Sequence, residues 1–167
     1  MTIPIHAAVL LQVIPLCTIT FYEAVHINGW LTPMASAWAV IEQDRKVLLV
    51  QRSNSTSRPS QWCFPGGGIR AGESAETACE REVHEEVGLK AQVTRNLLST
   101  ADQTYFLCRV ESKLIQLDPS ECQAFAWVEP RSMLRIGAIM ELRKVVQVLK
   151  SLGYEPELPA GFKPITL

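Results

Sequence analysis

The segment that most constrains the fold of this chain runs from residue 65 to residue 88. It begins with a proline and three consecutive glycines, and glycine allows tight backbone conformations that other residues adopt poorly. Ser74 is a favourable N-cap residue, and Gly88 is a favourable residue just after a helix C-terminus. The sequence therefore predicts a tight loop that leads into a helix from Ser74 to Val87.

The face that this helix would bury is unusual. Side chains that recur every 3.6 residues share one stripe, and the first part of this stripe is small and apolar, as close packing on a sheet requires. Its last turns carry Glu82 and Glu86 instead, with Glu85 at the edge, although an acidic face normally lies opposite the apolar one. The stripe consists of Ala75, Ala78, Cys79, Glu82, Val83 and Glu86.

These glutamates conflict with one another electrostatically. Like charges three or four residues apart on a helix repel by about 0.2–0.5 kcal/mol per pair, and burial raises that cost. The C-terminal end of a helix is also unfavourable for anions. A divalent cation resolves these conflicts, and carboxylate oxygens favour Mg²⁺ or Mn²⁺. On the helix alone, a solvated acidic face with Arg81 and Lys90 as counter-charges is an equally good interpretation.

The remainder of the chain alternates strands and helices, which predicts one α/β layered domain. Gln43, Asp44 and Arg45 form a predicted hairpin turn, and the polar stretch 53–60 is a predicted loop. The predicted strands are 35–42, 46–52, 91–98, 105–111 and 123–128, and a second helix is predicted over 136–152, ending at Gly153.

The bulk properties exclude some classes of function. A net charge of −1 gives no general attraction to duplex nucleic acid, whose binders usually have a clustered basic surface. The five cysteines are widely spaced and form no CxxC motif. We therefore expect buried free thiols and a cytoplasmic location, where thiols stay reduced.

The N-terminal segment 1–33 differs from the rest, so we place the main domain at 34–167. Residues 7–19 are strongly apolar, but no Lys or Arg precedes Arg45, as a secretory leader would require. Pro4 and Pro15 interrupt the run, which argues against a membrane-spanning helix or a membrane role. Its Val, Ile and Thr content favours extra strands or an arm that forms a homodimer.

The motif around the acidic helix resembles a known family. Gly67 is followed after five residues by Glu73 and, after seven more, by the run Arg-Glu-Val-His-Glu-Glu-Val-Gly-Leu at 81–89. This pattern matches the Nudix box, and a chance match in this chain has a probability on the order of 10⁻⁷. The box covers 67–89, and 35–152 is compatible with the family. The resemblance implies the Nudix fold, a mixed β-sheet sandwiched between α-helices (α/β/α).

The resemblance also implies roles for the residues of the box. Glu82, Glu85 and Glu86 would hold the catalytic metals, directly or through water, and Glu73 would support them. The backbone carbonyl of Gly66 would complete the coordination. Arg81 would orient a glutamate by an ion pair instead of binding phosphate. His84 falls at a variable position of the box, and we expect it on the surface.

The reaction implied by the resemblance is hydrolysis of a diphosphate that links a nucleoside to another group. A general base must accept a proton from the attacking water. Glu82 or Glu85 could serve from the box, and Glu121 could serve from a later turn, although a solvated turn glutamate is an equally good interpretation of Glu121. A Nudix-fold sensor that binds nucleotides without hydrolysing them is the alternative function, but such proteins usually have a degraded box.

Three further residues are candidates for substrate binding. Arg52 could contact a phosphate or base, Trp62 could stack on a base, and Tyr105 stands where dinucleoside-polyphosphate hydrolases carry a tyrosine. A surface position for the arginine and core packing for the two aromatic residues are the alternatives. The substrate is expected to be a small nucleotide: a nucleoside triphosphate, a dinucleoside polyphosphate or a nucleotide sugar.

Overall fold

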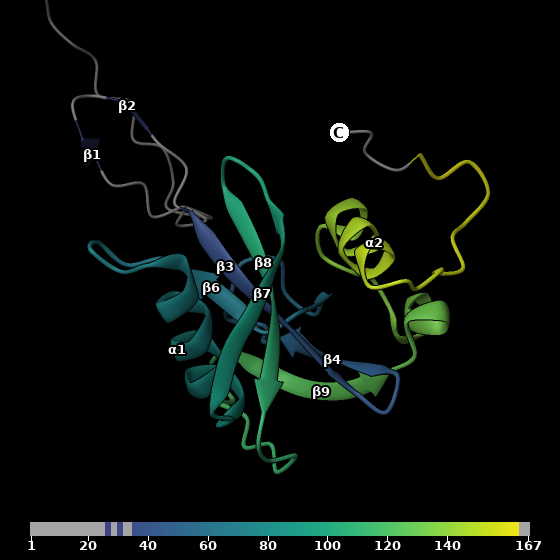
Figure 1. Cartoon of the computed structure of the whole chain (residues 1–167), viewed down its shortest axis with the longest axis horizontal. Helices are drawn as coiled ribbons and strands as arrows, with labels where there is room; N and C mark the ends of the chain where they lie inside the picture. Colours follow the sequence, from purple (N-terminus) through teal and green to yellow (C-terminus); the bar gives the residue numbers. More distant parts are fainter. Residues whose placement is uncertain (1–25, 28–29, 32–34, 164–167) are drawn as a thin grey trace, which may run out of the picture.

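The computed structural model describes residues 26–27, 30–31 and 35–163, and Figure 1 shows the arrangement of their helices and strands. In chain order the elements are β1 (His26–Ile27), β2 (Trp30–Leu31), β3 (Ser36–Gln43), β4 (Lys46–Arg52), β5 (Trp62–Cys63), β6 (Gly66–Gly68), α1 (Ala75–Val87), β7 (Ala91–Ser99), β8 (Gln103–Val110), β9 (Cys122–Val128), a 3₁₀ helix (Pro130–Ile136) and α2 (Leu142–Ser151).

The main sheet is mixed and splits behind its first hairpin. β3 and β4 are antiparallel neighbours at the hairpin, where Gln43 pairs with Lys46. Beyond it, β3 pairs with β6 and runs parallel to β8, while β4 pairs with β5 and β9. β7 extends the β8 side as an antiparallel edge strand. Because the two halves diverge, loops from both of them can reach one end of α1.

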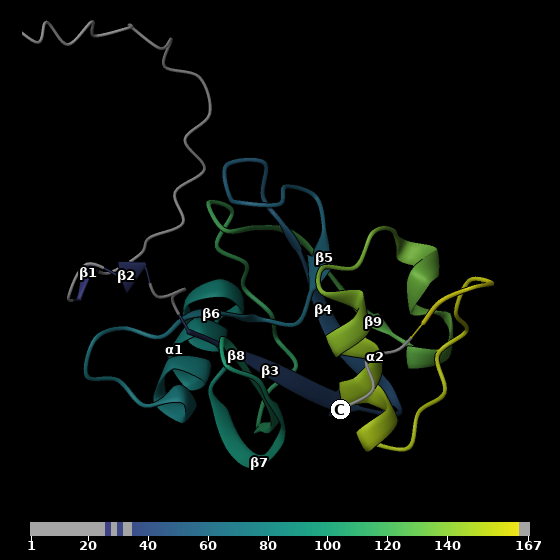
Figure 2. The same cartoon turned by 90° about the horizontal axis from the view of Figure 1, so that it is seen from above.

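The two helices lie on either side of the strands, which confirms the predicted α/β/α layering (Figures 1 and 2). α1 packs against β3, β6 and β7 through small and branched side chains, and α2 packs against β7. The core between the layers is continuous, and β3 and β4 contribute nearly uninterrupted runs of fully buried residues to it. Strands covered on both faces are expected to be apolar in this way.

The predicted N-terminus of the second helix is wrong, because α2 begins at Leu142 and not at residue 136. Residues 130–136 form a 3₁₀ helix that ends at Gly137, whose φ of 136° cannot continue a helix. The next residues run along β5 instead, because the Trp62 N–H donates to the Ala138 carbonyl and the Met140 N–H donates to the Trp62 carbonyl, both at 2.8 Å. Tertiary pairing therefore overrides the helical periodicity of this stretch.

Most of the N-terminal segment lies outside the described residues. The backbone of His26–Ile27 pairs antiparallel with that of Trp30–Leu31, apart from the main sheet. The dimer-forming arm stays a prediction. Within the described residues, no helix is both long and apolar enough to cross a membrane. Cys63, Cys79, Cys108 and Cys122 are buried free thiols, as expected, and Cys17 lies outside the described part.

The hairpin between β3 and β4 generates a stability prediction. Its two turn residues, Asp44 and Arg45, have φ of 52° and 59°. Residues other than glycine adopt this left-handed backbone conformation only at an energetic cost. Arg45→Gly should raise the free energy of unfolding by about 0.5–1 kcal/mol in urea titrations. Lys46→Gly, one residue later in an extended strand, should lower it. A destabilised Arg45→Gly variant would contradict this account of the turn.

Candidate active site

Helix α1 carries the acidic side chains into the interior. Its start is fixed by Ser74, whose Oγ accepts a hydrogen bond from the Thr77 N–H at 3.1 Å. Its end is fixed by Gly88, which has a φ of 68° and donates its N–H to the His84 carbonyl. Between these caps the buried face is Ala78, Cys79, Glu82, Val83, Glu86 and Val87. The predicted stripe is therefore buried except for Ala75, which is half-buried, and Val87 extends it.

Three glutamates meet at the C-terminal half of this face. Glu82, Glu86 and Glu121 each place one carboxylate oxygen within 4.8 Å of the others. Glu82 is 9% exposed and Glu86 only 2% exposed, whereas Glu121 is partly exposed. Glu121 lies in the turn before β9. This turn contacts the end of α1, because the Asp118 N–H donates to the Glu86 carbonyl at 3.0 Å. The fold thus joins a residue outside the box to two of its glutamates.

Burial and mutual repulsion disfavour negative charge in this cluster. Burial raises the pKa of Glu86 to about 8, and the charges of Glu82 and Glu121 add to the increase. A hydrogen bond of 2.9 Å from the Gly66 N–H to Glu86 Oε2 and the charge of Arg52 act in the opposite direction. Burial also raises the pKa of Glu82, against the lowering effect of Arg81. The charges of Arg81 and Arg52 therefore offset the effect of burial only in part.

The glycine run lets the backbone approach these carboxylates closely. A Cβ atom on Gly67 would lie 2.6 Å from the carboxyl carbon of Glu82, so a side chain there would displace this carboxylate. Gly66 has a φ of 149° and pairs with Trp38 of β3. It faces Glu86 with its N–H, and the metal-binding role expected for its carbonyl stays a prediction.

Arg81 is the centre of an ion-pair network beside the cluster. Its guanidinium binds both carboxylate oxygens of Glu73, with Nε–Oε1 at 2.8 Å and Nη2–Oε2 at 2.9 Å. Nη1 lies 2.7 Å from Oε1 of Glu82 and 2.7 Å from Oε2 of Glu85, and Nη2 also donates to the Gly68 carbonyl. The hydrogen bonds from Arg81 are the main reason that the pKa of Glu73 falls to about 2. Arg81 thus links three box glutamates to the glycine loop.

Glu85 lies apart from the three clustered glutamates. Besides Arg81, it accepts two hydrogen bonds from Nη2 of Arg70, at 3.1 and 3.2 Å. Arg70 belongs to the loop between β6 and α1, and sequence analysis did not single it out, since a loop residue fifteen positions before its partner gives no periodic signal. His84 is exposed, as expected. The structure therefore separates Glu85 from Glu82 and Glu86, although the three are close in sequence.

The three substrate-binding candidates have different environments. Arg52 is partly buried at the end of β4, where its Nε donates to the Ser57 carbonyl at 2.7 Å, and its charge acts on Glu86. Trp62 is 8% exposed and packs beside Gly137. Tyr105 is 2% exposed, stacks with Trp38 and donates its hydroxyl proton to Gln103 Oε1. Only Arg52 of the three lies next to the acidic cluster with a polar group accessible to solvent.

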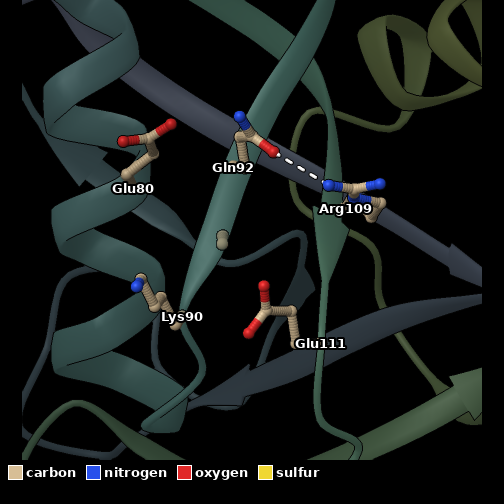
Figure 3. A pocket seen from close by; sticks show the side chains of 6 residues that line it. Glu80, Lys90, Gln92, Arg109 and Glu111 are labelled. Carbon is tan, nitrogen blue, oxygen red and sulfur yellow. Dashed lines mark hydrogen bonds between the residues drawn. The ribbon is translucent and has the colours of Figure 1, made fainter.

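A hollow of about 360 Å³ lies where α1 faces β7 and β8 (Figure 3). Charged groups of both signs surround it, and Nη2 of Arg109 donates to Oε1 of Gln92 at 3.2 Å. Its lining contains none of the clustered glutamates, so the hollow is distinct from the candidate active site. The lining residues are Glu80, Lys90, Ala91, Gln92, Arg109 and Glu111.

Comparison with known proteins places the chain in a family. The family model described as the NUDIX domain matches residues 31–149. The chain therefore belongs to the NUDIX family, and the resemblance inferred from the box is confirmed. The predicted boundary between residues 33 and 34 stays a prediction.

Similar proteins are known from archaea and bacteria. The ADP-ribose pyrophosphatase of Methanocaldococcus jannaschii is 41% identical over 66 residues, which are 38% of this chain and only 37% of that protein. The CTP pyrophosphohydrolase of Escherichia coli K12 is 30% identical over 109 residues, 58% of this chain and 76% of that protein. A solved structure of a NUDIX hydrolase from Nitrosomonas europaea superposes with a TM-score of 0.60 at 26% identity, covering 73% of this chain and 89% of the other.

The raised pKa of Glu86 generates a pH prediction for the metal-free protein. The folded state keeps this proton up to about pH 8, whereas the unfolded chain releases it near the ordinary value of 4.5. Between these values the folded state binds more protons, so the free energy of unfolding should decrease as pH rises, by at most about 1.4 kcal/mol per pH unit from this group. Urea titrations in EDTA at pH 5, 6, 7 and 8 measure the effect.

Glu86→Gln removes the titrating group and keeps an acceptor for the Gly66 N–H. The stability of this variant relative to wild type should therefore increase steadily from pH 5 to pH 8. Parallel pH profiles for the two proteins would show that Glu86 is ionised in the folded protein across this range.

Proposed function

We propose that this protein is a metal-dependent Nudix pyrophosphohydrolase that cleaves a nucleoside-diphosphate-linked small molecule. The observation that carries the proposal is the convergence of Glu82, Glu86 and Glu121, two of them buried, in a chain of the NUDIX family. A cluster of carboxylates that burial drives toward protonation is costly to maintain unless a cation compensates it. An intact box favours this function over a nucleotide sensor.

The donor set fits a hard divalent cation. Carboxylate oxygens are the ligands of Mg²⁺ and Mn²⁺, and cysteine or histidine would be expected for softer metals. Glu82, Glu86 and Glu121 would hold the ion, and Mg²⁺ is the proposed cofactor, with Mn²⁺ as a substitute. When bound, the cation neutralises phosphate oxygens and lowers the pKa of a water molecule.

The protein's own residues supply orientation and proton transfer. Arg81 fixes the Glu82 carboxylate from one side, and the Gly66 N–H fixes the Glu86 carboxylate from another. Within the described residues, the Glu121 carboxylate accepts no hydrogen bond from a protein donor, so one of its oxygens would bind the ion while the other accepts a proton from water. We assign the general base to Glu121 in preference to Glu85, because the Glu85 carboxylate is already hydrogen-bonded to the guanidinium groups of Arg70 and Arg81.

The substrate class follows from the family and from local charge. Arg52 is the proposed contact for a phosphate of the substrate, because its charge acts on Glu86, whereas Arg81 is held by the box glutamates. The names of the relatives, an ADP-ribose pyrophosphatase and a CTP pyrophosphohydrolase, fall within the proposed range of nucleotide sugars, nucleoside triphosphates and dinucleoside polyphosphates. A cytoplasmic location is proposed from the buried free thiols.

Glu86→Gln should reduce turnover by about 100-fold or more, because it removes a buried charge from the cation site. The measurement is release of phosphate or monophosphate from a nucleotide panel that includes ADP-ribose and CTP, with Mg²⁺ or Mn²⁺ present. Glu76→Gln, an exposed glutamate in the first turn of the same helix, is the matched control and should retain wild-type turnover. Near-normal turnover of Glu86→Gln would rule out the proposed metal site.

Glu121→Gln tests the assignment of the base. It should lower kcat strongly, because the group that accepts the proton from water is lost. A loss of only a few-fold, together with a large loss in Glu85→Gln, would return the role of base to the box.

A further inference from the structure

Ser53 contacts both peptide groups that flank the Cα atom of Glu121. Its Oγ donates to the Ser120 carbonyl at 2.7 Å, which belongs to the peptide group before Glu121. Its N–H donates to the Glu121 carbonyl at 2.8 Å, which belongs to the peptide group after it. Since these two groups set φ and ψ of Glu121, Ser53 controls the direction in which the Glu121 side chain leaves the backbone. Ser53 is also one of the few buried polar residues of the described chain, at 4% exposure.

The pairing of β4 with β9, next to this contact, contains a bulge that also affects the orientation of Glu121. Gln51 pairs with Ala124, but Arg52 pairs with Cys122, so Gln123 is an extra residue in β9. Such a bulge changes which side chains point to which face of a sheet. The Ser53–Glu121 contact directly follows the bulge, where an unsupported strand end would be free to fray.

Other bonds hold the rest of the turn, and the N–H groups of Glu121 and Cys122 both donate to the Asp118 carbonyl, at 3.2 and 2.9 Å. The Asp118 N–H is bound to the Glu86 carbonyl at 3.0 Å, and Asp118 Oδ1 accepts hydrogen bonds from the N–H and Oγ of Ser120. Ser55 adds a second hydroxyl to the Ser120 carbonyl, at 2.9 Å, from an exposed position. The turn is therefore fixed on the helix side by Glu86 and on the strand side by Ser53 and Ser55.

We propose that Ser53 is a positioning residue that holds the Glu121 carboxylate toward Glu82 and Glu86. Its backbone bond continues the β4–β9 ladder, and its hydroxyl bond sets the preceding peptide group. The hydroxyl bond is the side-chain part of this restraint, so its loss should let the Glu121 carboxylate move away from Glu82 and Glu86. The inference rests on the proposed function, because it assigns Ser53 a task in the same cation site.

The probe for this role is Mn²⁺ alone, whose dissociation constant is measured by calorimetric titration of the full chain. Ser53→Ala should weaken Mn²⁺ binding on the order of fivefold, the equivalent of one lost hydrogen bond. Thr56→Val is the matched control, because the Thr56 hydroxyl donates to the Ser53 carbonyl at 2.9 Å without touching the Glu121 turn. This control should bind Mn²⁺ as wild type does.

A double-mutant cycle separates positioning from general destabilisation. Glu121→Gln should weaken Mn²⁺ binding more than Ser53→Ala does, and adding Ser53→Ala to Glu121→Gln should cause no further loss. Additive losses, or an unchanged dissociation constant in Ser53→Ala, would overturn the inference. If Ser53→Ala does not fold, Ser55→Ala replaces it in the cycle with a smaller expected loss and the same criterion.

The same titrations distinguish this inference from the proposed function. Failure of the wild-type protein to bind Mn²⁺, or wild-type affinity in Glu86→Gln, contradicts the metal site itself. Normal Mn²⁺ affinity in Ser53→Ala, alongside weakened binding in both glutamate variants, contradicts only the role of Ser53.

Discussion

Mutual repulsion among buried carboxylates is the constraint on which the arrangement of this protein depends. Glu82 and Glu86 lie one turn apart on the packed face of α1, and Glu121 joins them from a different part of the chain. In water these charges would separate, and in the interior they shift toward protonation. The surrounding structure therefore has to hold them together against an electrostatic force. The Gly66 N–H and Arg81 supply most of the hydrogen bonds that hold these carboxylates in place.

The fold divides this task between two sides. On the loop side, the Gly66 N–H binds Glu86, and Gly67 leaves space for the Glu82 carboxylate. On the outer side, Arg81 links Glu73, Glu82 and Glu85 into one network, and Arg70 adds a second cation at Glu85. Glu73 and Glu85 thus bind guanidinium groups, Glu82 shares Arg81 with them, and no arginine or lysine forms an ion pair with Glu86 or Glu121 within the described residues. The inner cluster is therefore the part of the network with the least compensated negative charge.

Features of this site that depend on neighbouring residues in the sequence can be predicted from it, whereas features that depend on contacts between distant segments cannot. The caps at Ser74 and Gly88 follow from residue preferences, and the acidic residues of the buried stripe, with Glu85 at its edge, follow from helical periodicity. The contact between Glu85 and Arg70 does not, because Arg70 reaches it from a loop. The predicted start of α2 was wrong for a similar reason. Residues 138–140 pair with β5, and no local sequence pattern indicates this contact. Glu121 was identified by its place before a strand, but its meeting with Glu86 depends on the β4–β9 pairing.

The most direct test of the central claim is a crystal structure of the protein soaked in MnCl₂, with anomalous diffraction data that locate Mn²⁺. The account predicts one strong anomalous peak with oxygen atoms of Glu82, Glu86 and Glu121 at about 2.1 Å from the ion. A peak bound instead by Glu73 and Glu85, with Glu121 turned away, would contradict it. So would the absence of any peak near Glu86 at a Mn²⁺ concentration that supports turnover.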